Sequence, residues 1–134
     1  MRKVLNILLT GGTGFIGSHT SLVLNHAGHN VVLYDNLTNS NSKINNTLST
    51  ITGKIFPLIN GDIRDTEKLI KTFIDYKIDA VIHLAGKKAV NVSIEKPIYY
   101  YDNNVVGSIS LLKAMQHTKL KSLVFSSSAT VYGN

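Results

Sequence analysis

The sequence predicts an α/β fold, a doubly wound sheet of parallel strands with helices on both faces. Short apolar runs alternate with longer segments whose apolar residues recur at helical spacing. The first apolar run passes into a glycine-rich loop, and the second ends in an acidic residue. Strands that alternate with helices are joined by right-handed crossovers, so neighbouring strands are expected to be parallel.

The first strand is expected from Val4 to Leu9, which is apolar except for Asn6, as in a strand covered on both faces. After the glycine-rich loop, Ile16 to Ala27 is a predicted helix that ends at Gly28. Three of its apolar residues are expected to face the core, namely Ile16, Leu22 and Val23.

The second strand is expected at 31–35, and the polar segment 36–53 reads as a loop around a weak helix near 43–51. A third strand is predicted from Ile55 to Ile59. Because Pro57 cannot donate a backbone hydrogen bond, this strand should be short or near an edge of the sheet.

The second half of the chain repeats the alternation. Asp65 is a good capping residue for a helix. The apolar stripe expected on that helix is formed by Leu69, Ile70, Phe73 and Ile74. Strands follow at 80–84 and 123–125, and Pro97 suits the first turn of a long helix between them. The stripe expected to repeat along that helix is Ile98, Val105, Ile109 and Leu112.

Composition narrows the function classes. A chain of 134 residues with 43% hydrophobic content is expected to form one domain, residues 1–134. It has no cysteine, which excludes disulfides and thiolate metal sites, and its histidines lack the partners of a metal site. The net charge of +6 is scattered, so no nucleic-acid partner is expected. No run is long enough to cross a membrane, and a cytoplasmic location is expected.

The loop around Gly11, Gly14 and Gly17 predicts a dinucleotide site. Such a loop lets a phosphate approach the backbone N–H groups at a helix N-terminus, where positive partial charge collects. The spacing fits both GxGxxG and TGxxGxxG, and the second resembles the extended short-chain dehydrogenase/reductase superfamily. Asp35 stands where a Rossmann-like fold has an acid for the adenosine ribose, which favours NAD over NADP.

Other polar residues stand where predicted strands end, which is where ligands of such a sheet bind. Asp62 could accept from the adenine amino group while Ile63 packs on the ring, or Asp62 could simply form a turn. The pair 85–86 could bring bare backbone to the cofactor or end the strand. Lys88 could lie near a phosphate or remain solvated, and His83 is interpreted as a packed core histidine.

The segments TGGTGFIGSHT, DNLTNS, GDIRD, VIHLAGKKAV, EKPIYYYDNNV and FSSSATVYG, in this order, resemble the UDP-glucose 4-epimerase family. The resemblance implies a UDP-sugar substrate, bound NAD and a homodimer. It implies NAD contacts at Phe15, Ile16, Asp35, Asn36, Leu37, Thr38, Asn39, Ser40, Asp62, Ile63, Leu84, Ala85, Gly86, Lys87, Lys88 and Asn103. The chain departs from the family pattern at Lys87, at Asn91-Val92 and at Val106.

The resemblance also implies that Ser128 touches the sugar, and a hydroxyl that donates and accepts suits an oxygen that cycles between alcohol and ketone. In the family, a tyrosine with a lysine four residues later removes the hydroxyl proton while hydride passes to NAD. None of the six tyrosines here, Tyr132 included, has that lysine. The chain is therefore expected to be the N-terminal part of an epimerase, truncated after about the fifth strand and inactive alone. The alternatives are another NAD-dependent sugar-nucleotide epimerase or dehydratase, or a non-catalytic NAD-binding module.

Overall fold

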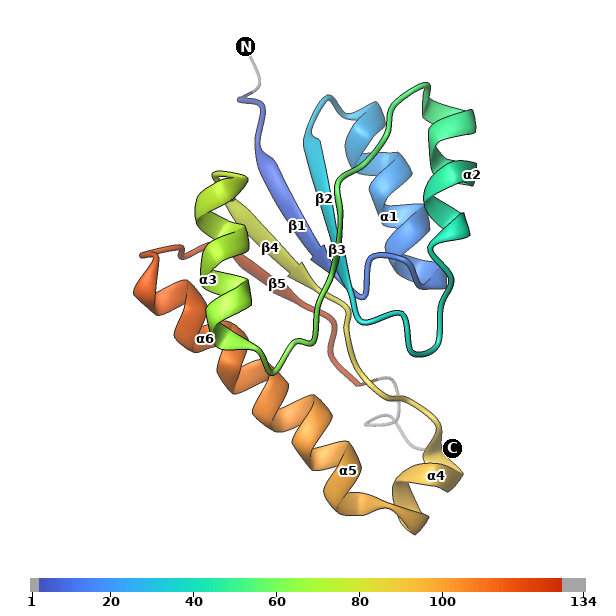
Figure 1. The fold of residues 1–134 in the computed structure, drawn as a ribbon, viewed down its shortest axis with the longest axis vertical. Coiled ribbons are helices and arrows are strands. Elements are labelled where there is room, and N and C mark those ends of the chain that lie inside the picture. The colour runs from blue at the N-terminus through green and yellow to red at the C-terminus, as the bar shows by residue number, and fades with distance from the viewer. Residues whose placement is uncertain (1–2, 129–134) are drawn as a thin grey trace.

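In the computed structural model, which describes residues 3–128, five strands form one parallel sheet in the order β3-β2-β1-β4-β5 (Figure 1). The strands are β1 (Asn6–Thr10), β2 (Asn30–Asp35), β3 (Leu58–Asn60), β4 (Ala80–His83) and β5 (Leu123–Phe125). The helices are α1 (Phe15–His26), α2 (Lys43–Thr52), α3 (Thr66–Asp75), α4 (Val90–Glu95), α5 (Pro97–Tyr101), the π-helical η1 (Asp102–Val106) and α6 (Gly107–His117). The predicted α/β class is confirmed, and the fold is Rossmann-like.

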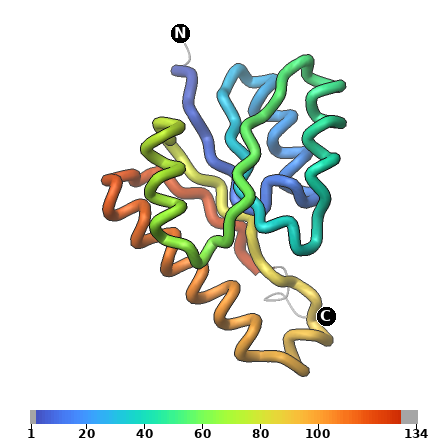
Figure 2. The backbone as a smooth tube through the Cα atoms, viewed as in Figure 1, coloured from blue at the N-terminus to red at the C-terminus, as the bar shows by residue number. Residues whose placement is uncertain are grey.

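Two cores lie on opposite faces of the sheet. Because side chains alternate along a strand, Leu8 of β1 packs with α3 and α6, whereas Leu9 packs with the face that α1 and α2 cover. The tube view shows the same two layers of helices with the sheet between them (Figure 2). No helix within residues 3–128 is long and apolar enough to cross a membrane.

The first helix lies against the sheet by a different face from the one predicted. Ile16 and Val23 are 51% and 68% exposed, so the prediction that they face the core is wrong. The buried face of α1 is made of small residues, Gly17, Ser18 and Ser21, while Leu22 packs at the edge of the core. Small side chains let the helix approach the sheet closely, and apolar periodicity alone cannot detect this.

The predicted capping of α3 and the position of β3 are confirmed. The Asp65 carboxylate accepts a hydrogen bond from the Lys68 N–H at 3.0 Å, and α3 begins at the next residue. Leu69 and Phe73 are buried as expected, but Ile74 is 61% exposed, which corrects the predicted stripe. The third strand is short and lies at the edge of the sheet, as Pro57 indicated.

The long segment after Pro97 is helical, and the π-helix η1 joins its two α-helical parts, α5 and α6. The four apolar residues that repeat at helical spacing along it, Ile98, Val105, Ile109 and Leu112, are all exposed, so this stripe does not face the core. Another face of the segment packs against α3 and the sheet, formed by Asn103, Gly107, Ser110, Leu111, Ala114 and Met115. The short helix α4 has no counterpart among the predicted elements.

Candidate functional site

A cavity of about 410 Å³ lies at the carboxyl edge of the sheet, between the loops that follow β1, β2, β3 and β4. All residues predicted to contact the cofactor line this cavity except Leu37 and Asp62. Gly61, which precedes Asp62 at the end of β3, lines it as well, and so does Tyr34, which no sequence pattern indicated. The fold therefore brings five separate segments, counting η1, to one concave site.

The glycine loop leaves backbone donors at the entrance to α1. Gly11 has the left-handed φ of +67°, its N–H donates to the Tyr34 carbonyl of β2 at 2.8 Å, and its carbonyl accepts from the Gly14 N–H at 3.1 Å, which closes the turn after β1. Gly14 is the N-cap residue of α1, and no side chain caps this end of the helix. The first N–H groups of a helix have no partners within the helix, so this end suits an anion.

Gly17 fixes how closely the loop and α1 pack. A Cβ at this position would lie 2.3 Å from the Gly11 carbonyl oxygen and 2.8 Å from the Gly12 Cα. Both contacts are to backbone, which cannot rotate away as a side chain can. Only glycine fits here without moving the loop.

Asp35, which is 9% exposed, connects the glycine loop to the loop after β2. One carboxylate oxygen accepts from the Thr13 N–H at 3.1 Å. The other accepts from the Leu37 N–H at 2.9 Å and from the Ser40 hydroxyl at 3.2 Å. Leu37 itself has a left-handed φ of +59°, so its backbone forms the turn that brings its N–H to Asp35. One acceptor position, on the oxygen that binds the Thr13 N–H, remains for a further donor in the cavity that Asp35 lines.

His83 is a buried anchor, as the sequence indicated. The Thr10 hydroxyl oxygen accepts from the N–H groups of Leu84 and Ala85, at 3.1 and 3.2 Å. The Thr10 hydroxyl then donates its hydrogen to Nδ1 of His83, which lies 2.6 Å away. The opposite nitrogen, Nε2, donates to the Ser108 hydroxyl at 3.2 Å. Burial lowers the pKa of His83 to about 4, so the ring is neutral and fixes where β4 ends.

Asn104, which the sequence reasoning missed, holds the loop after β4. Its side-chain oxygen accepts from the Lys87 N–H at 2.8 Å, and its amide donates to the Lys87 carbonyl at 3.0 Å. The buried Asn103 donates to the same Asn104 oxygen at 3.0 Å. The wider π-helical turn carries both asparagines, a feature that is frequent at functional sites. Lys87 extends over the Tyr99 ring, with its ammonium 4.5 Å from the ring centre.

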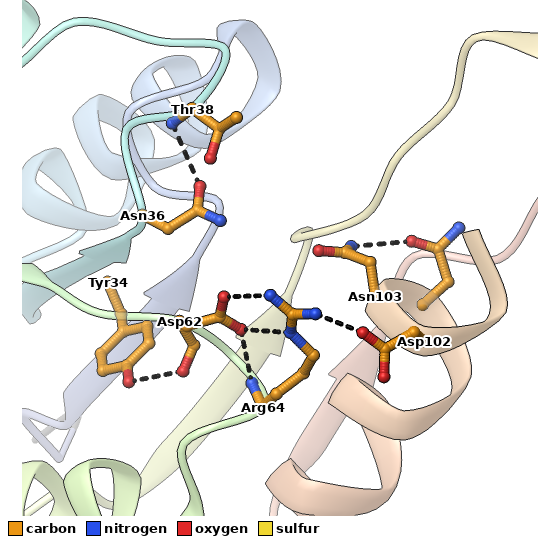
Figure 3. A network of polar contacts seen from close by, with 8 residues as sticks. Tyr34, Asn36, Thr38, Asp62, Arg64, Asp102 and Asn103 are labelled. Atoms are coloured by element: carbon orange, nitrogen blue, oxygen red, sulfur yellow. Dashed lines mark hydrogen bonds and ion pairs between the residues drawn. The ribbon is translucent and has the colours of Figure 1, made fainter. Parts of the chain in front are cut away.

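Asp62 belongs to a polar network with Arg64, Tyr34 and Asp102 (Figure 3). The Tyr34 hydroxyl donates to the Asp62 carbonyl at 3.0 Å. The Asp62 carboxylate accepts from the Arg64 backbone and guanidinium, and these hydrogen bonds hold its pKa below the ordinary value. Burial, with the charges of Asp65 and Asp62, raises the pKa of Tyr34, which stays a neutral donor. Asp62 thus forms the predicted turn, and its carboxylate is already oriented.

Ser128 follows β5, is exposed and does not line the cavity. It stands at the same carboxyl edge of the sheet, two residues after Ser126, whose N–H donates to the His83 carbonyl at 3.1 Å. Tyr132, which has no lysine four residues later, lies outside the described residues. Ser128 therefore remains a prediction as a catalytic residue.

Residues 8–134 match the family described as GDP-mannose 4,6 dehydratase. A UDP-glucose 4-epimerase of Neisseria meningitidis serogroup A is 56% identical over 129 residues, which are 96% of this chain and 38% of the relative. A UDP-glucose 4-epimerase of Klebsiella pneumoniae is 48% identical over 130 residues, which are 97% of this chain and 94% of the relative. Apart from the Klebsiella sequence, the chain spans about 38% of the length of the relatives it matches.

Solved structures agree with the sequence relatives. The UDP-glucose-4-epimerase of Stenotrophomonas maltophila, determined with bound NAD and formylated UDP-arabinopyranose, superposes with a TM-score of 0.94 at 45% identity, covering 97% of this chain and 39% of the other. The UDP-glucose 4-epimerase of Bifidobacterium longum, in complex with NAD⁺ and UDP, superposes with a TM-score of 0.92 at 45% identity, covering 96% of this chain and 38% of the other. The similarity thus extends over nearly all of the chain described here.

Proposed function

Because the chain belongs to the family described as GDP-mannose 4,6 dehydratase, and to its UDP-glucose 4-epimerase members, we propose that its cavity binds NAD. The observation that carries the proposal is that one cavity contains both an uncapped helix N-terminus, that of α1, and a buried acidic residue, Asp35. The helix N-terminus suits a diphosphate, and the acidic residue suits ribose hydroxyls. The related structures from Stenotrophomonas and Bifidobacterium hold this cofactor.

The proposed binding mode assigns each wall of the cavity to one part of NAD. The diphosphate lies at the entrance of α1, over Gly14, and a hydroxyl of the adenosine ribose donates to Asp35. The adenine lies between Ile63 and the backbone at Ala85 and Gly86, with its amino group directed to Asp62. The residues that line this part of the cavity support the assignment, because they offer the apolar Ile63 beside the Asp35 carboxylate.

The proposed reaction is the interconversion of UDP-glucose and UDP-galactose by the protein to which this chain contributes. Bound NAD would accept hydride from C4 of the sugar and return it to the other face, so it would be regenerated in each turnover. The hydroxyl of Ser128 would hold the C4 oxygen in both its alcohol and its ketone state. The identities of 48% to 56% to UDP-glucose 4-epimerases favour this reaction over a dehydratase reaction and over a non-catalytic role.

A titration of NAD and NADP into the purified chain tests the cofactor. Asp35 would repel a ribose 2′-phosphate, and residues 36–42 contain no arginine to bind one, so NAD should bind more tightly. Replacing Asp35 by Ala removes charged hydrogen bonds and should weaken NAD binding about tenfold or more, while narrowing the difference from NADP. Asp75→Ala, which breaks only an exposed pair with Lys71, is the matched control. Equal or tighter binding of NADP by the parent chain contradicts the assignment.

An assay of the complete gene product with UDP-galactose tests the reaction. Ser128→Ala should lower turnover by about 10²-fold or more, as expected for loss of a donor at a reacting oxygen, and leave NAD binding unchanged. Ser122→Ala, at the opposite end of β5, controls for the loss of an exposed serine hydroxyl. Unchanged turnover in the Ser128 variant would leave this residue as a strand end only.

We also propose that the complete protein pairs with a second copy through the outer face of α5, η1 and α6. The exposed residues on this face, Ile98, Val105, Ile109 and Leu112, form an apolar surface of the kind that interfaces cover. Light scattering of the complete gene product gives the mass that decides between one copy and two. The cytoplasmic location remains a prediction.

A further inference from the structure

Arg64 joins two walls of the cavity. Its guanidinium pairs with Asp62, in the turn after β3, and with Asp102, the first residue of η1 (Figure 3). The neighbouring Ile63 touches the same helical segment, because a Cβ at Gly107 would come within 2.5 Å of its Cγ2. The turn that carries Asp62 and Ile63 is therefore held against η1 and α6 at two consecutive residues.

The hydrogen bonds to Asp62 leave a defined acceptor. One carboxylate oxygen, Oδ1, accepts from the Arg64 N–H and from the Arg64 Nε–H, both at 2.9 Å. The other, Oδ2, accepts from one guanidinium nitrogen at 2.7 Å. A carboxylate oxygen accepts about two hydrogen bonds, so both positions on Oδ1 are used and one position on Oδ2 remains.

We propose that Arg64 is a positioning residue for base recognition, which presents the remaining lone pair of Asp62 Oδ2 to the 6-amino group of adenine. The inference rests on the proposed binding of NAD and adds the residue that makes the site selective for adenine. The bond from Arg64 to Asp102 fixes the guanidinium from the η1 side, so the carboxylate does not have to be ordered when the base binds. Gly61 and Ile63, which flank Asp62, line the cavity, whereas Asp62 and Arg64 do not, so Arg64 acts on the base only through the carboxylate that stands beside the lining.

Nicotinamide hypoxanthine dinucleotide provides a direct probe. It differs from NAD at one edge of the base, where a carbonyl oxygen replaces the 6-amino group and the adjacent N1 carries a hydrogen. A carboxylate held at position 6 meets an acceptor there in hypoxanthine, and it keeps a hydrogen bond to the base only by shifting to N1–H. The ratio of the two dissociation constants therefore reports the orientation of Asp62, whereas a general loosening of the site weakens both dinucleotides together.

The experiment is calorimetric titration of both dinucleotides into the complete gene product and its variants. The parent protein should prefer NAD about tenfold or more, the value expected for one hydrogen bond to a charged acceptor. Arg64→Ala should bring the ratio to about threefold or less on the same scale, chiefly by weakening NAD, and Arg64→Lys should give an intermediate ratio. Lys71→Ala removes another exposed cation that pairs with an aspartate and should leave the ratio at the parent value.

A double-mutant comparison separates action through Asp62 from a direct effect. Asp62→Asn should lower the ratio as far as Arg64→Ala does, and the double variant should lower it no further. A parent ratio retained in Arg64→Ala, an increased ratio, or an equal loss of affinity for both dinucleotides would overturn the inference. A parent protein that binds neither dinucleotide would instead overturn the proposed function, so the two failures are distinguishable.

Discussion

Replacing Gly17 by Ala tests whether the glycine loop forms the diphosphate site. The added Cβ would lie 2.3 Å from the Gly11 carbonyl oxygen, where ordinary contacts begin at 3.4 Å. The loop and the start of α1 must therefore separate by about 1 Å to relieve the clash, the difference between those two distances. Both contacts under 2.9 Å are to backbone, so no side-chain rotation can absorb the strain.

The displacement has two measurable costs. Overpacking of this kind lowers the free energy of unfolding by about 1–3 kcal/mol, which urea denaturation measures. A phosphate placed by the first N–H groups of α1 would lose alignment with at least one of them. The loss of one hydrogen bond to a charged group weakens NAD binding by about tenfold or more, which calorimetry measures.

Gly53→Ala is the matched control, since Gly53 ends α2 and is not among the residues that line the cavity. Its φ is +69° and no atom lies within 4 Å of the added Cβ, so the substitution strains only the backbone. It should cost about 1 kcal/mol of stability and leave NAD binding unchanged. If both Gly17→Ala and Gly53→Ala bound NAD with the dissociation constant of the parent chain, the glycine loop would not be the diphosphate site.

Three further predictions follow from the same geometry. The pKa of His83 is about 4 in the folded chain and about 6.5 in the unfolded chain, so protonation favours unfolding. The free energy of unfolding should therefore fall by about 3 kcal/mol from pH 6.5 to pH 4. In urea denaturation, His83→Gln should reduce this dependence of the free energy of unfolding on pH. Asn104→Ala should cost about 1–3 kcal/mol and speed amide hydrogen exchange at Lys87, whereas the exposed Asn46→Ala should do neither. The 134-residue chain alone should not convert UDP-galactose to UDP-glucose when NAD is supplied, because no tyrosine in it has a lysine four residues later. Activity near that of a complete epimerase would contradict this and would require a general base other than such a tyrosine.

The parts of the fold that depend on local signals could be predicted from the sequence. Apolar runs of strand length mark all five strands, and Asp65 marks the start of α3. The glycine loop and Asp35 could be assigned to one site because carboxyl ends of parallel strands meet at one edge. These features depend on a few neighbouring residues and on the geometry common to such sheets.

The parts that depend on packing partners could not be predicted. The exposed Ile16 and Ile109 belong to helices that pack by another face, which is made of small residues in α1 and of small and apolar residues in α6. Periodicity does not say which of these faces is covered. Asn104 and Arg64 bond to residues 17 and 38 positions away, so no local pattern reveals their roles. The π-helical turn that aims Asn104 at the loop likewise has no sequence signal of its own.

Amide NMR shifts during a titration of this 14.7 kDa chain decide whether the cavity at the carboxyl edge binds NAD. We expect saturable shifts at Gly14, Asp35, Ile63 and Ala85, which line the cavity from four different segments. No change is expected at the hollow lined by Phe73, Lys77, Lys119 and Lys121. Saturable shifts confined to that hollow, or none anywhere in a folded chain, would contradict the claim.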